Sequence, residues 1–286
     1  MRALLALFAA TALMPALADE QVERGRYLTT AAGCITCHTE DVDGAVPFAG
    51  GRPLVSDFGT FYAPNITPDP DTGIGRWTEA DFLRALREGR SPQGEAYFPA
   101  FPFPSYTGIT DADAAAIFAY LRSLPATRQA SRDHEMPWYL RPRMGAAMWQ
   151  SLYFEAGAFV PDPARTPEWN RGAYLVRHLG HCAECHSPRG RMGALLPERE
   201  LAGNPAGPEG RKVPNITPHE QDGIGEWSAS EIETFLEIGM EPDGDFVGAG
   251  MGEVIEENTA KLSPEDRRAI ATYLLSLAPL PAATNK

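Results

Sequence analysis

The four cysteines of this 286-residue sequence all belong to two copies of one pattern, Cys-x-x-Cys-His. The six residues of the two copies are Cys34, Cys37, His38, Cys182, Cys185 and His186. Two thiols at this spacing can add to the vinyl groups of a porphyrin, and the adjoining histidine can bind its iron. The pattern therefore indicates two covalently attached c-type haems, with His38 and His186 as first axial ligands.

Two other chemistries use cysteines at this spacing. A C-x-x-C pair can form the redox centre of a thioredoxin-like protein, but that centre belongs to a βαβ setting that this sequence lacks. Cysteine and histidine can also bind structural zinc, but a zinc site brings four ligands together from other spacings. Neither alternative explains a histidine directly after both pairs, so haem attachment remains the interpretation.

A second repeated phrase follows each haem pattern. The first copy is APNITPDPDTGIGRW at residues 63–77, and the second is VPNITPHEQDGIGEW at residues 213–227. The two copies lie about 150 residues apart, which is outside the range of solenoid repeats. The chain is therefore predicted to contain two copies of one small helical module.

Three predicted helices in each module position the haem pattern and the repeated phrase. The helix before each haem pattern contains a glycine, Gly25 or Gly172, which lets another helix cross closely. The two later helices begin at Thr or Ser followed by acidic residues, which is usual N-cap chemistry. Their ranges are 78–89 and 110–125 in the first module, and 228–239 and 263–279 in the second. Each module has so few apolar residues that a haem is expected to form its centre.

The first residues predict export. One arginine precedes an apolar run and a small-residue A-L-A that ends at Ala18, which is the layout of a cleavable secretory signal peptide. No later stretch reaches the roughly 18 consecutive apolar residues of a membrane span. We therefore expect a periplasmic protein whose mature chain has no membrane span. The predicted parts are a signal peptide over 1–18, a first repeat over 19–125, a connection over 126–166 and a second repeat over 167–286.

The charge of the chain restricts its partners. The formal net charge is −13, and removal of the signal peptide with its one arginine makes it −14. A negative field disfavours nucleic acid and anionic lipid, and it favours a partner with a basic docking face. The same charge also has a plainer explanation, because it keeps an exported protein soluble.

The mature chain resembles the dihaem class I cytochromes c. It is similar to the cytochrome subunits of bacterial periplasmic dehydrogenases for alcohols, aldehydes, sugars and sugar acids. The phrases that carry the resemblance are GRYLTTAAGCITCHT, PFAGGRPLVSDFGTFYAPNITPDPDTGIGRWTEADF, YFPAFPFPSY and RGAYLVRHLGHCAECHSPRG. The resemblance implies an all-α fold of two tandem cytochrome c domains, each wrapped around a covalent haem.

The resemblance also suggests what the repeated phrase does. It implies that the P-N-I-T segments of Asn65 and Asn215, with Trp77 and Trp227, line the haem edges. Their backbone N–H groups and the indole N–H groups would then donate hydrogen bonds to haem propionates, a role that suits a donor-only side chain with an apolar body. The alternative is that these residues only form turns and pack as core aromatics.

By the same resemblance, the second axial ligand of each iron is expected between the last two helices. In the second repeat this loop offers Met240 and Met251, and Met251 occupies the ligand position of the family. Met240 directly follows the preceding helix, so packing is expected there. A thioether ligand favours Fe(II), so the second haem should have the higher potential.

The corresponding loop of the first repeat has no Met, His, Lys or Cys, and Phe101 stands where many relatives carry Met. Three outcomes are open: a five-coordinate iron, a weak ligand such as Tyr97 or Tyr106, or a ligand from the connection. His134 is the first candidate, because imidazole binds iron in either oxidation state. An exposed loop histidine is the plainer alternative. The other candidates of the connection are Met136, Met144 and Met148.

Three further histidines are not assigned to iron. His178 and His181 precede the second haem pattern and are expected to face solvent or to lie near propionates, and His219 is expected in a loop.

These expectations describe a periplasmic electron carrier. It would take single electrons from a partner dehydrogenase and pass them to a downstream acceptor, with no catalytic residues of its own because the cofactors do the chemistry. The alternative is a dihaem oxidoreductase whose first haem has an open or displaceable sixth position. The first-repeat loop without a usual ligand favours this alternative. The carboxylates and histidines show no acid–base arrangement that would support it.

Overall fold

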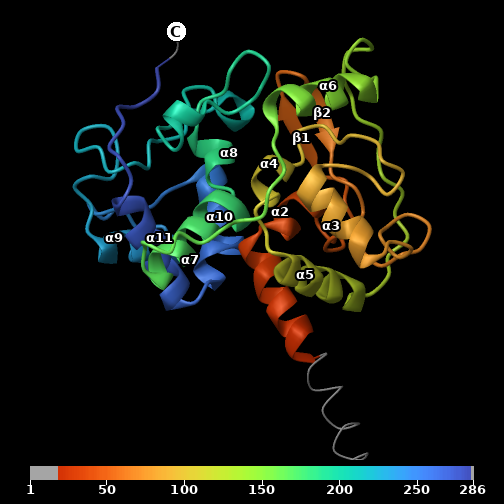
Figure 1. Ribbon diagram of the computed structural model, residues 1–286, viewed down its shortest axis with the longest axis horizontal. Coiled ribbons are helices and arrows are strands. Elements are labelled where there is room, and N and C mark those ends of the chain that lie inside the picture. Colours follow the sequence, from red (N-terminus) through yellow and green to blue (C-terminus); the bar gives the residue numbers. More distant parts are fainter. Residues whose placement is uncertain (1–18, 285–286) are drawn as a thin grey trace, which may run out of the picture.

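A computed structural model describes residues 19–284, and it is mostly helical (Figure 1). The predicted signal peptide and its cleavage after Ala18 lie outside the described residues. The first repeat contains a helix that includes residues 19–31, then α2 (Cys34–His38), β1 (Pro53–Ser56), β2 (Gly59–Tyr62), α3 (Glu79–Glu88), α4 (Phe103–Tyr106) and α5 (Asp111–Ser123). The connection contains α6 (Arg143–Tyr153).

The second repeat has the same order of main helices, with additional short π- and 3₁₀-helical turns. Its elements are α7 (Pro167–Tyr174), η1 (Leu175–Leu179), α8 (Ala183–His186), η2 (Pro197–Arg199), η3 (Pro208–Gly210), α9 (Ala229–Ile238), α10 (Ala249–Glu257), η4 (Thr259–Lys261) and α11 (Pro264–Leu275). The all-α class is therefore right. Within residues 19–284, no helix is both long enough and apolar enough to cross a membrane.

The helix starts agree with the sequence patterns. Thr78 and Ser228 each form a capping box, in which the hydroxyl accepts from the third residue of the helix and that residue's carboxylate accepts from the cap backbone. The third helix of each repeat is also capped, by Thr110 for α5 and by Ser263 for α11. These four helices are therefore fixed at their first turns by local chemistry.

Two glycines allow the first and last helices of each repeat to cross in contact. A Cβ atom on Gly25 would lie 1.9 Å from the carbonyl oxygen of Ala116, and one on Gly172 would lie 1.9 Å from that of Ala269. Real Cβ atoms do not approach an oxygen this closely. The prediction that these glycines permit a close helix crossing is confirmed.

The hairpin of β1 and β2 was not predicted from the sequence. The two strands have four residues each and pair antiparallel, from Pro53 opposite Tyr62 to Ser56 opposite Gly59. Thr60 also exchanges backbone hydrogen bonds of 2.8 and 2.9 Å with Glu135 of the connection. Strands of four residues are near the lower limit of strand length, so their alternating pattern is easily missed in a sequence. This hairpin is also held by Glu135, which is distant in the sequence.

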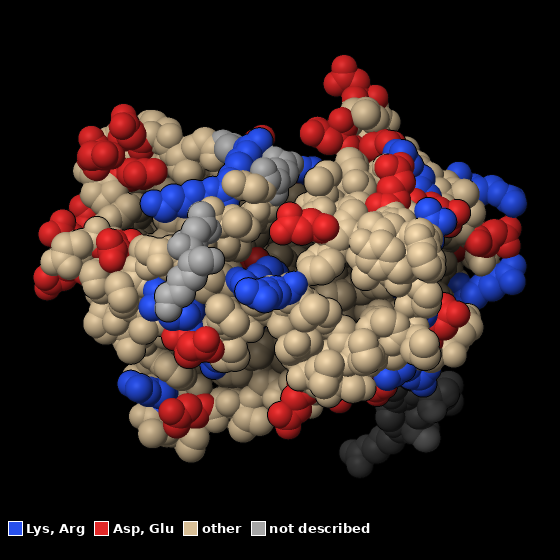
Figure 2. Space-filling view, turned by 90° about the horizontal axis from the view of Figure 1, so that it is seen from above, with Lys and Arg blue, Asp and Glu red and all other residues tan. Residues whose placement is uncertain are grey.

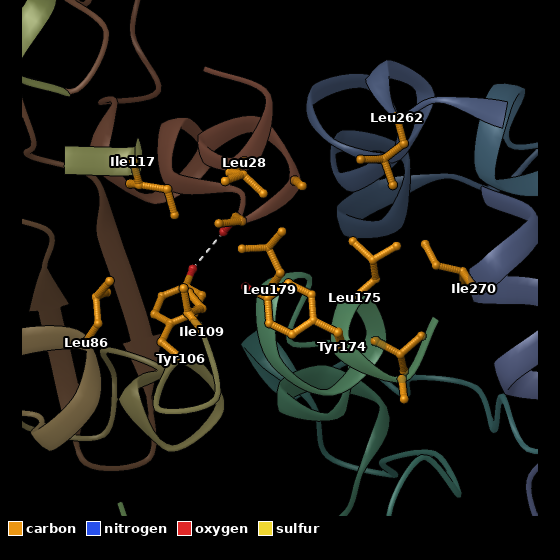
Figure 3. Packing of buried hydrophobic residues seen from close by; sticks show 14 of the residues in the cluster. Leu28, Leu86, Tyr106, Ile109, Ile117, Tyr174, Leu175, Leu179, Leu262 and Ile270 are labelled. Atoms are coloured by element: carbon orange, nitrogen blue, oxygen red, sulfur yellow. Dashed lines mark hydrogen bonds between the residues drawn. The ribbon is translucent and has the colours of Figure 1, made fainter. Parts of the chain in front are cut away.

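The two repeats lie side by side, the first in red to yellow-green and the second in green to blue (Figure 1). Their buried apolar side chains form one continuous cluster. Figure 3 shows Leu28, Tyr106 and Ile109 of the first repeat facing Leu179 and Tyr174 of the second. The repeats therefore share one packed contact, and Cys34 and Cys182 of the two haem patterns pack against it.

Candidate functional site

The two histidines of the haem patterns have the same hydrogen-bond partner. Nδ1 of His38, at the end of α2, lies 2.7 Å from the carbonyl oxygen of Pro64, and Nδ1 of His186, at the end of α8, lies 2.8 Å from that of Pro214. Because a carbonyl can only accept, Nδ1 carries the hydrogen and Nε2 keeps a free lone pair. Burial lowers the pKa of both imidazoles, which favours the neutral form. This is the arrangement of a metal-binding histidine with its orienting partner.

The four cysteines lie on or beside α2 and α8, and no disulfide joins any two of them. Burial raises the pKa of Cys34 and Cys182 to about 12 and that of Cys185 to about 11. A redox-active C-x-x-C pair has a lowered thiol pKa, so these values oppose the thioredoxin-like interpretation. Among the residues described, no three or more His, Cys, Asp or Glu side chains come together as a metal-binding group. The donors present therefore fit covalent haem attachment.

The repeated P-N-I-T phrase forms a polar clasp. Nδ2 of Asn65 donates to the carbonyl oxygen of Thr127 at 2.8 Å, and its Oδ1 accepts from the backbone N–H and hydroxyl of Thr67 at 2.9 and 2.7 Å. The same three bonds recur in the second repeat. Nδ2 of Asn215 donates to Leu280 O at 2.6 Å, and its Oδ1 accepts from the backbone N–H and hydroxyl of Thr217, both at 2.8 Å. The clasp ties the phrase to the chain that leaves the last helix of the repeat.

The clasp directly follows the proline whose carbonyl accepts the hydrogen bond of the haem-pattern histidine. The side chain of Asn65 therefore holds the backbone in place. The backbone N–H of Asn65 lies 3.4 Å from the Ser131 hydroxyl. The N–H of Ile66 donates to Phe48 O. Contact of Asn65 and Asn215 with haem stays a prediction, whereas their hydrogen bonds within each repeat are observed.

The two tryptophans of the phrase have a different environment. Trp77 and Trp227 are half-buried, and among residues 19–284 neither indole N–H donates to a protein acceptor. By contrast, the indole of Trp149 donates to Met192 O at 2.8 Å and that of Trp169 donates to the Ser276 hydroxyl at 2.6 Å. Donors left without a protein acceptor fit the predicted role toward haem propionates, which stays a prediction.

The candidate sixth ligand of the second haem lies on α10. Met251 is the third residue of this helix and is partly buried. The helix packs against α9 and against α2 of the first repeat. Glu253 accepts both guanidinium hydrogen bonds of Arg52 at 2.6 and 2.8 Å, which fixes α10 to the first repeat. The assignment of Met251 to iron stays a prediction.

Aromatic packing fills the first-repeat loop where a ligand was expected. The Phe101 ring lies 5.7 Å from that of Tyr97 and 5.8 Å from that of Tyr106, measured between centroids. The Tyr106 hydroxyl donates to Ala32 O at 2.7 Å, and burial raises its pKa well above the usual value. Burial also raises the pKa of Tyr97 to about 12. Because iron is bound by a tyrosinate, these environments oppose both tyrosines as ligands.

The connection places His134 against the hairpin. Its Nδ1 accepts from the backbone N–H of Tyr62 at 3.2 Å, and its ring packs on Phe61 and Phe98 with centroids 5.2 and 5.9 Å away. Burial is the main cause of its lowered pKa, so the ring is neutral and the proton is on Nε2. This is the opposite tautomer from His38. Iron binding by His134 stays a prediction, and this hydrogen bond opposes it.

The three methionines of the connection differ in burial. The Met136 side chain is 8% exposed, whereas those of Met144 and Met148 are 81% and 60% exposed. Only Met136 of these three is therefore placed inside the protein, beside Gly59 of the hairpin.

The two haem patterns meet where the repeats touch. Cys34 of the first pattern and Cys182 of the second both pack against the apolar cluster that the repeats share. Across the same contact the Ser105 hydroxyl donates to Glu184 at 2.7 Å. Nδ1 of His178 lies 3.0 Å from Ser105 O, and Nε2 of His181 lies 3.3 Å from Ala32 O. The expectation that His178 and His181 face solvent is wrong, because both take part in the contact between repeats, and the alternative that they lie near propionates stays a prediction.

A reciprocal pair of polar clusters closes this contact. The Tyr27 hydroxyl donates to Asp266 at 2.6 Å, and Arg171 donates to the same carboxylate at 2.8 and 2.6 Å. The equivalent cluster, with the repeats exchanged, consists of Tyr174, Asp113 and Arg24. Tyr27 and Tyr174 occupy matching positions before the two haem patterns, but the aspartate that each contacts belongs to the other repeat and could not be identified from the sequence.

Comparison with known proteins agrees with these features. The family model of cytochrome c matches residues 22–125 and 170–278. A diheme cytochrome c-type protein of Cereibacter sphaeroides is 43% identical over 260 residues, which cover 89% of this chain and 85% of that protein. The gluconate 2-dehydrogenase cytochrome c subunit of Pantoea cypripedii is 39% identical over 97% of this chain and 65% of its own length.

A third relative is longer. One of the nicotinate dehydrogenase subunits of Pseudomonas putida is 43% identical over 90% of this chain, and the match spans 21% of that relative. The two histidines oriented by prolines, the buried cysteine pairs and the matches over both repeats lead to one conclusion: the chain belongs to the cytochrome c family and is a binder of two covalently attached c-type haems.

Proposed function

We propose that this protein carries single electrons from a partner dehydrogenase to a downstream acceptor. The observation that carries the proposal is the contact between the repeats beside their haem patterns, where Nε2 of His181, next to Cys182, lies 3.3 Å from Ala32 O, two residues before Cys34. A bound c-type haem supplies reversible one-electron oxidation and reduction of its iron. Two such groups held at one packed contact suit the passage of electrons through the protein.

The chain's own residues hold and tune these groups. The carbonyls of Pro64 and Pro214 orient His38 and His186 toward iron, and the Asn-Thr clasps hold those carbonyls. We propose Met251 as the sixth ligand of the second haem, where its thioether favours Fe(II). Electrons would then move from the first haem to the second.

The names of the relatives support a dehydrogenase as the electron donor. They include cytochrome subunits of gluconate 2-dehydrogenase, of a quinone alcohol dehydrogenase from Gluconobacter oxydans and of fructose dehydrogenase from Gluconobacter japonicus. The chain spans 65%, 57% and 52% of these three proteins. A small alcohol, sugar, sugar acid or heteroaromatic acid is accordingly the proposed class of oxidised substrate. These names do not favour the alternative of a dihaem enzyme.

We place this activity in the periplasm. The layout of residues 1–18 supports export and cleavage after Ala18, and covalent haem attachment to C-x-x-C-H is consistent with that compartment. We likewise propose that the functional units are the two repeats, 19–125 and 167–286, joined by the connection 126–166.

Respiration of cells that lack this chain tests the proposed function. Cells with and without the gene are given alcohols, sugars, sugar acids or nicotinate, and oxygen consumption is measured beside dye-linked dehydrogenase activity. We expect the deletion to abolish oxygen consumption with one substrate class while the dye-linked activity remains. Restoring the wild-type chain should restore respiration, and a chain with Cys34→Ala and Cys182→Ala should not. Unchanged oxygen consumption with all four classes would contradict the proposal.

A further inference from the structure

Helix α6 of the connection has one buried face and one exposed apolar face. Ala146 and Gln150 point inward and are 3% and 5% exposed. Met144, Met148 and Leu152 follow one another at intervals of four residues, so they lie on one side of the helix. They are 81%, 60% and 66% exposed, which is unusual for three large apolar side chains in a row.

Further exposed apolar side chains lie just before α6 in the chain and in the second repeat where α6 contacts it. Trp138 and Tyr139 precede the helix and are 80% and 62% exposed. Met192 of the second repeat is 52% exposed, and its carbonyl accepts the indole hydrogen bond of Trp149 from α6. The name α6 face is used for Trp138, Tyr139, Met144, Met148, Leu152 and Met192 together. Figure 2 looks onto the end of the molecule where α6 lies, and uncharged surface covers much of its right half.

The charged residues within the stretch that forms most of the α6 face are positive, and Glu135 and Glu155 bound this stretch at its two ends. Residues 136–154 contain no Asp or Glu and two arginines, Arg141 and Arg143, in a chain of net charge −13. Arg143 is held over the Phe98 ring at 4.6 Å from its centroid, and Arg191 is exposed beside Met192. The charge of the whole chain favours a basic partner, but the three arginines beside this face favour acidic groups opposite them on the partner.

The buried side of α6 covers the loop predicted to lie over the first haem. Nε2 of Gln150 donates to Gly89 O at 2.8 Å, at the start of that loop. The ring of Phe103, at its far end, contacts Trp149 of α6 and Phe154, with centroids 6.3 and 4.8 Å away. The helix is therefore a single layer between the α6 face and the loop of the first haem.

We propose that the α6 face docks the partner dehydrogenase, through a surface of that enzyme with an apolar centre and a rim of carboxylates. This inference rests on the proposed function and names the surface that receives the electron donor. Aromatic residues, methionine and arginine are enriched in the cores of protein interfaces, while lysine and acidic residues are depleted there. Large exposed apolar patches mark interaction sites, and Met144, Met148 and Leu152 form such a patch along one side of α6. Docking here places the donor over the first haem, where electrons are proposed to arrive.

The test compares three affinity-tagged chains produced in their own host. One is wild type, one carries Met144→Asp and Met148→Asp, and the control carries Ile238→Asp and Phe246→Asp. The control positions are 52% and 65% exposed and lie at the end of α9 and in the loop after it. Each chain is purified at low salt, and the co-purifying dye-linked dehydrogenase activity is measured with the substrate identified by the respiration assay. Haem content and the visible spectrum verify that all three are folded.

Wild type and control should retain the dehydrogenase activity, and the Met144/Met148 variant should lose it at least about tenfold. Two carboxylates placed in an apolar interface core remain desolvated and unpaired there, and a tenfold loss needs only about 1.4 kcal/mol. Equal retention by the Met144/Met148 variant would overturn the proposal. Raising the salt should also weaken wild-type retention, because part of the attraction is between the arginines and the partner's acidic rim.

Two other occupants of the α6 face give distinct results. If sedimentation shows a wild-type dimer that the Met144/Met148 variant abolishes, the face binds a second copy of this chain and the proposal fails. If phosphatidylglycerol–phosphatidylethanolamine vesicles pellet the wild type and not this variant, the face binds a membrane and the proposal again fails. If the substrate fails to reduce the haems in all three chains, including the wild type, the proposed function itself is wrong and this inference fails with it.

Discussion

At the scale of single residues, the hydrogen bond to the ring decides what a histidine can do. His38 donates from Nδ1 to Pro64 O, while His134 accepts at Nδ1 from the Tyr62 N–H. The first leaves Nε2 free for iron, and the second puts the proton there. The sequence identifies His38 by its two neighbouring cysteines. It offers no comparable sign for His134, because the partner of that ring is 72 residues away.

Haem stoichiometry is the most direct residue-scale prediction. Because both cysteine pairs are complete, the exported wild type should carry two covalent haems, and Cys182→Ala should carry one and be partly unfolded. Mass spectrometry under denaturing conditions measures this, after periplasmic expression with haem maturation factors. An unmodified wild-type chain would show that the cysteines do not attach haem.

Replacement of Met251 should lower one redox potential. Loss of the thioether removes its preference for Fe(II), so Met251→Ala should shift one haem down by about a tenth of a volt or more, within the ~0.8 V that axial ligands span. The other haem should stay nearly fixed in a redox titration. Met240→Ala is the matched control, and a shift there without one in Met251→Ala would reverse the ligand assignment.

Spin state tests the sixth position of the first haem. Met136 is buried, while His134 has its Nε2 protonated, so we expect Met136→Ala to produce a high-spin signal and rapid carbon monoxide binding. His134→Ala should leave the spectrum unchanged. A high-spin signal from His134→Ala alone would restore His134 as the ligand. A high-spin haem already present in the wild type would support the open site of the enzyme alternative.

At the scale of elements, the starts of helices could be predicted from the sequence, because short-range hydrogen bonds determine them. The capped helices begin at Thr78, Ser228 and Ser263 because the cap side chains act within a few residues. The hairpin of β1 and β2 was missed because its strands are short and Glu135, far along the chain, completes its pairing. The role of the P-N-I-T phrase was only partly foreseen, since Asn65 reaches Thr127 and the bond depends on the folded repeat.

The helix crossing at Gly25 predicts a large effect of one methyl group. Gly25→Ala would force a Cβ to within 1.9 Å of Ala116 O, and the required shift of backbone should cost about 1–3 kcal/mol of unfolding free energy. Gly145→Ala on α6 is the control, because nothing lies within 4 Å of the added atom and helix propensity should stabilise it by about 0.5–1 kcal/mol. Urea unfolding of the haem-loaded protein measures both. Equal stability of the two variants would mean that the helices do not cross at this distance.

At the scale of the whole molecule, the contact between the repeats could not be predicted from the sequence. Tyr27 and Tyr174 occupy matching positions, yet each donates to the aspartate of the other repeat. The periodic pattern of a repeat describes its own helices and says nothing of which surface faces its copy. The same limit applies to the α6 face, whose residues form an amphipathic pattern whether or not a partner covers them.

The Asp266 cluster makes the stability of the whole molecule depend on acid. Burial alone would raise the pKa of Asp266, but hydrogen bonds from Arg171 and Tyr27 outweigh it and hold that pKa below its usual value. A lowered folded-state pKa stabilises the protein above the unfolded-state pKa of about 4, and this stabilisation is lost as the pH falls through the folded-state value. Asp266→Asn should therefore lower the unfolding free energy by about 1.5–3 kcal/mol at pH 7 and flatten its decline below pH 4. Tyr27→Phe should reproduce part of both effects, whereas Asp243→Asn, in an exposed loop, should have neither. Calorimetry on the haem-loaded proteins measures the unfolding free energy at each pH. If it depends on pH in the same way in wild type and in Asp266→Asn, then titration of Asp266 does not contribute to stability.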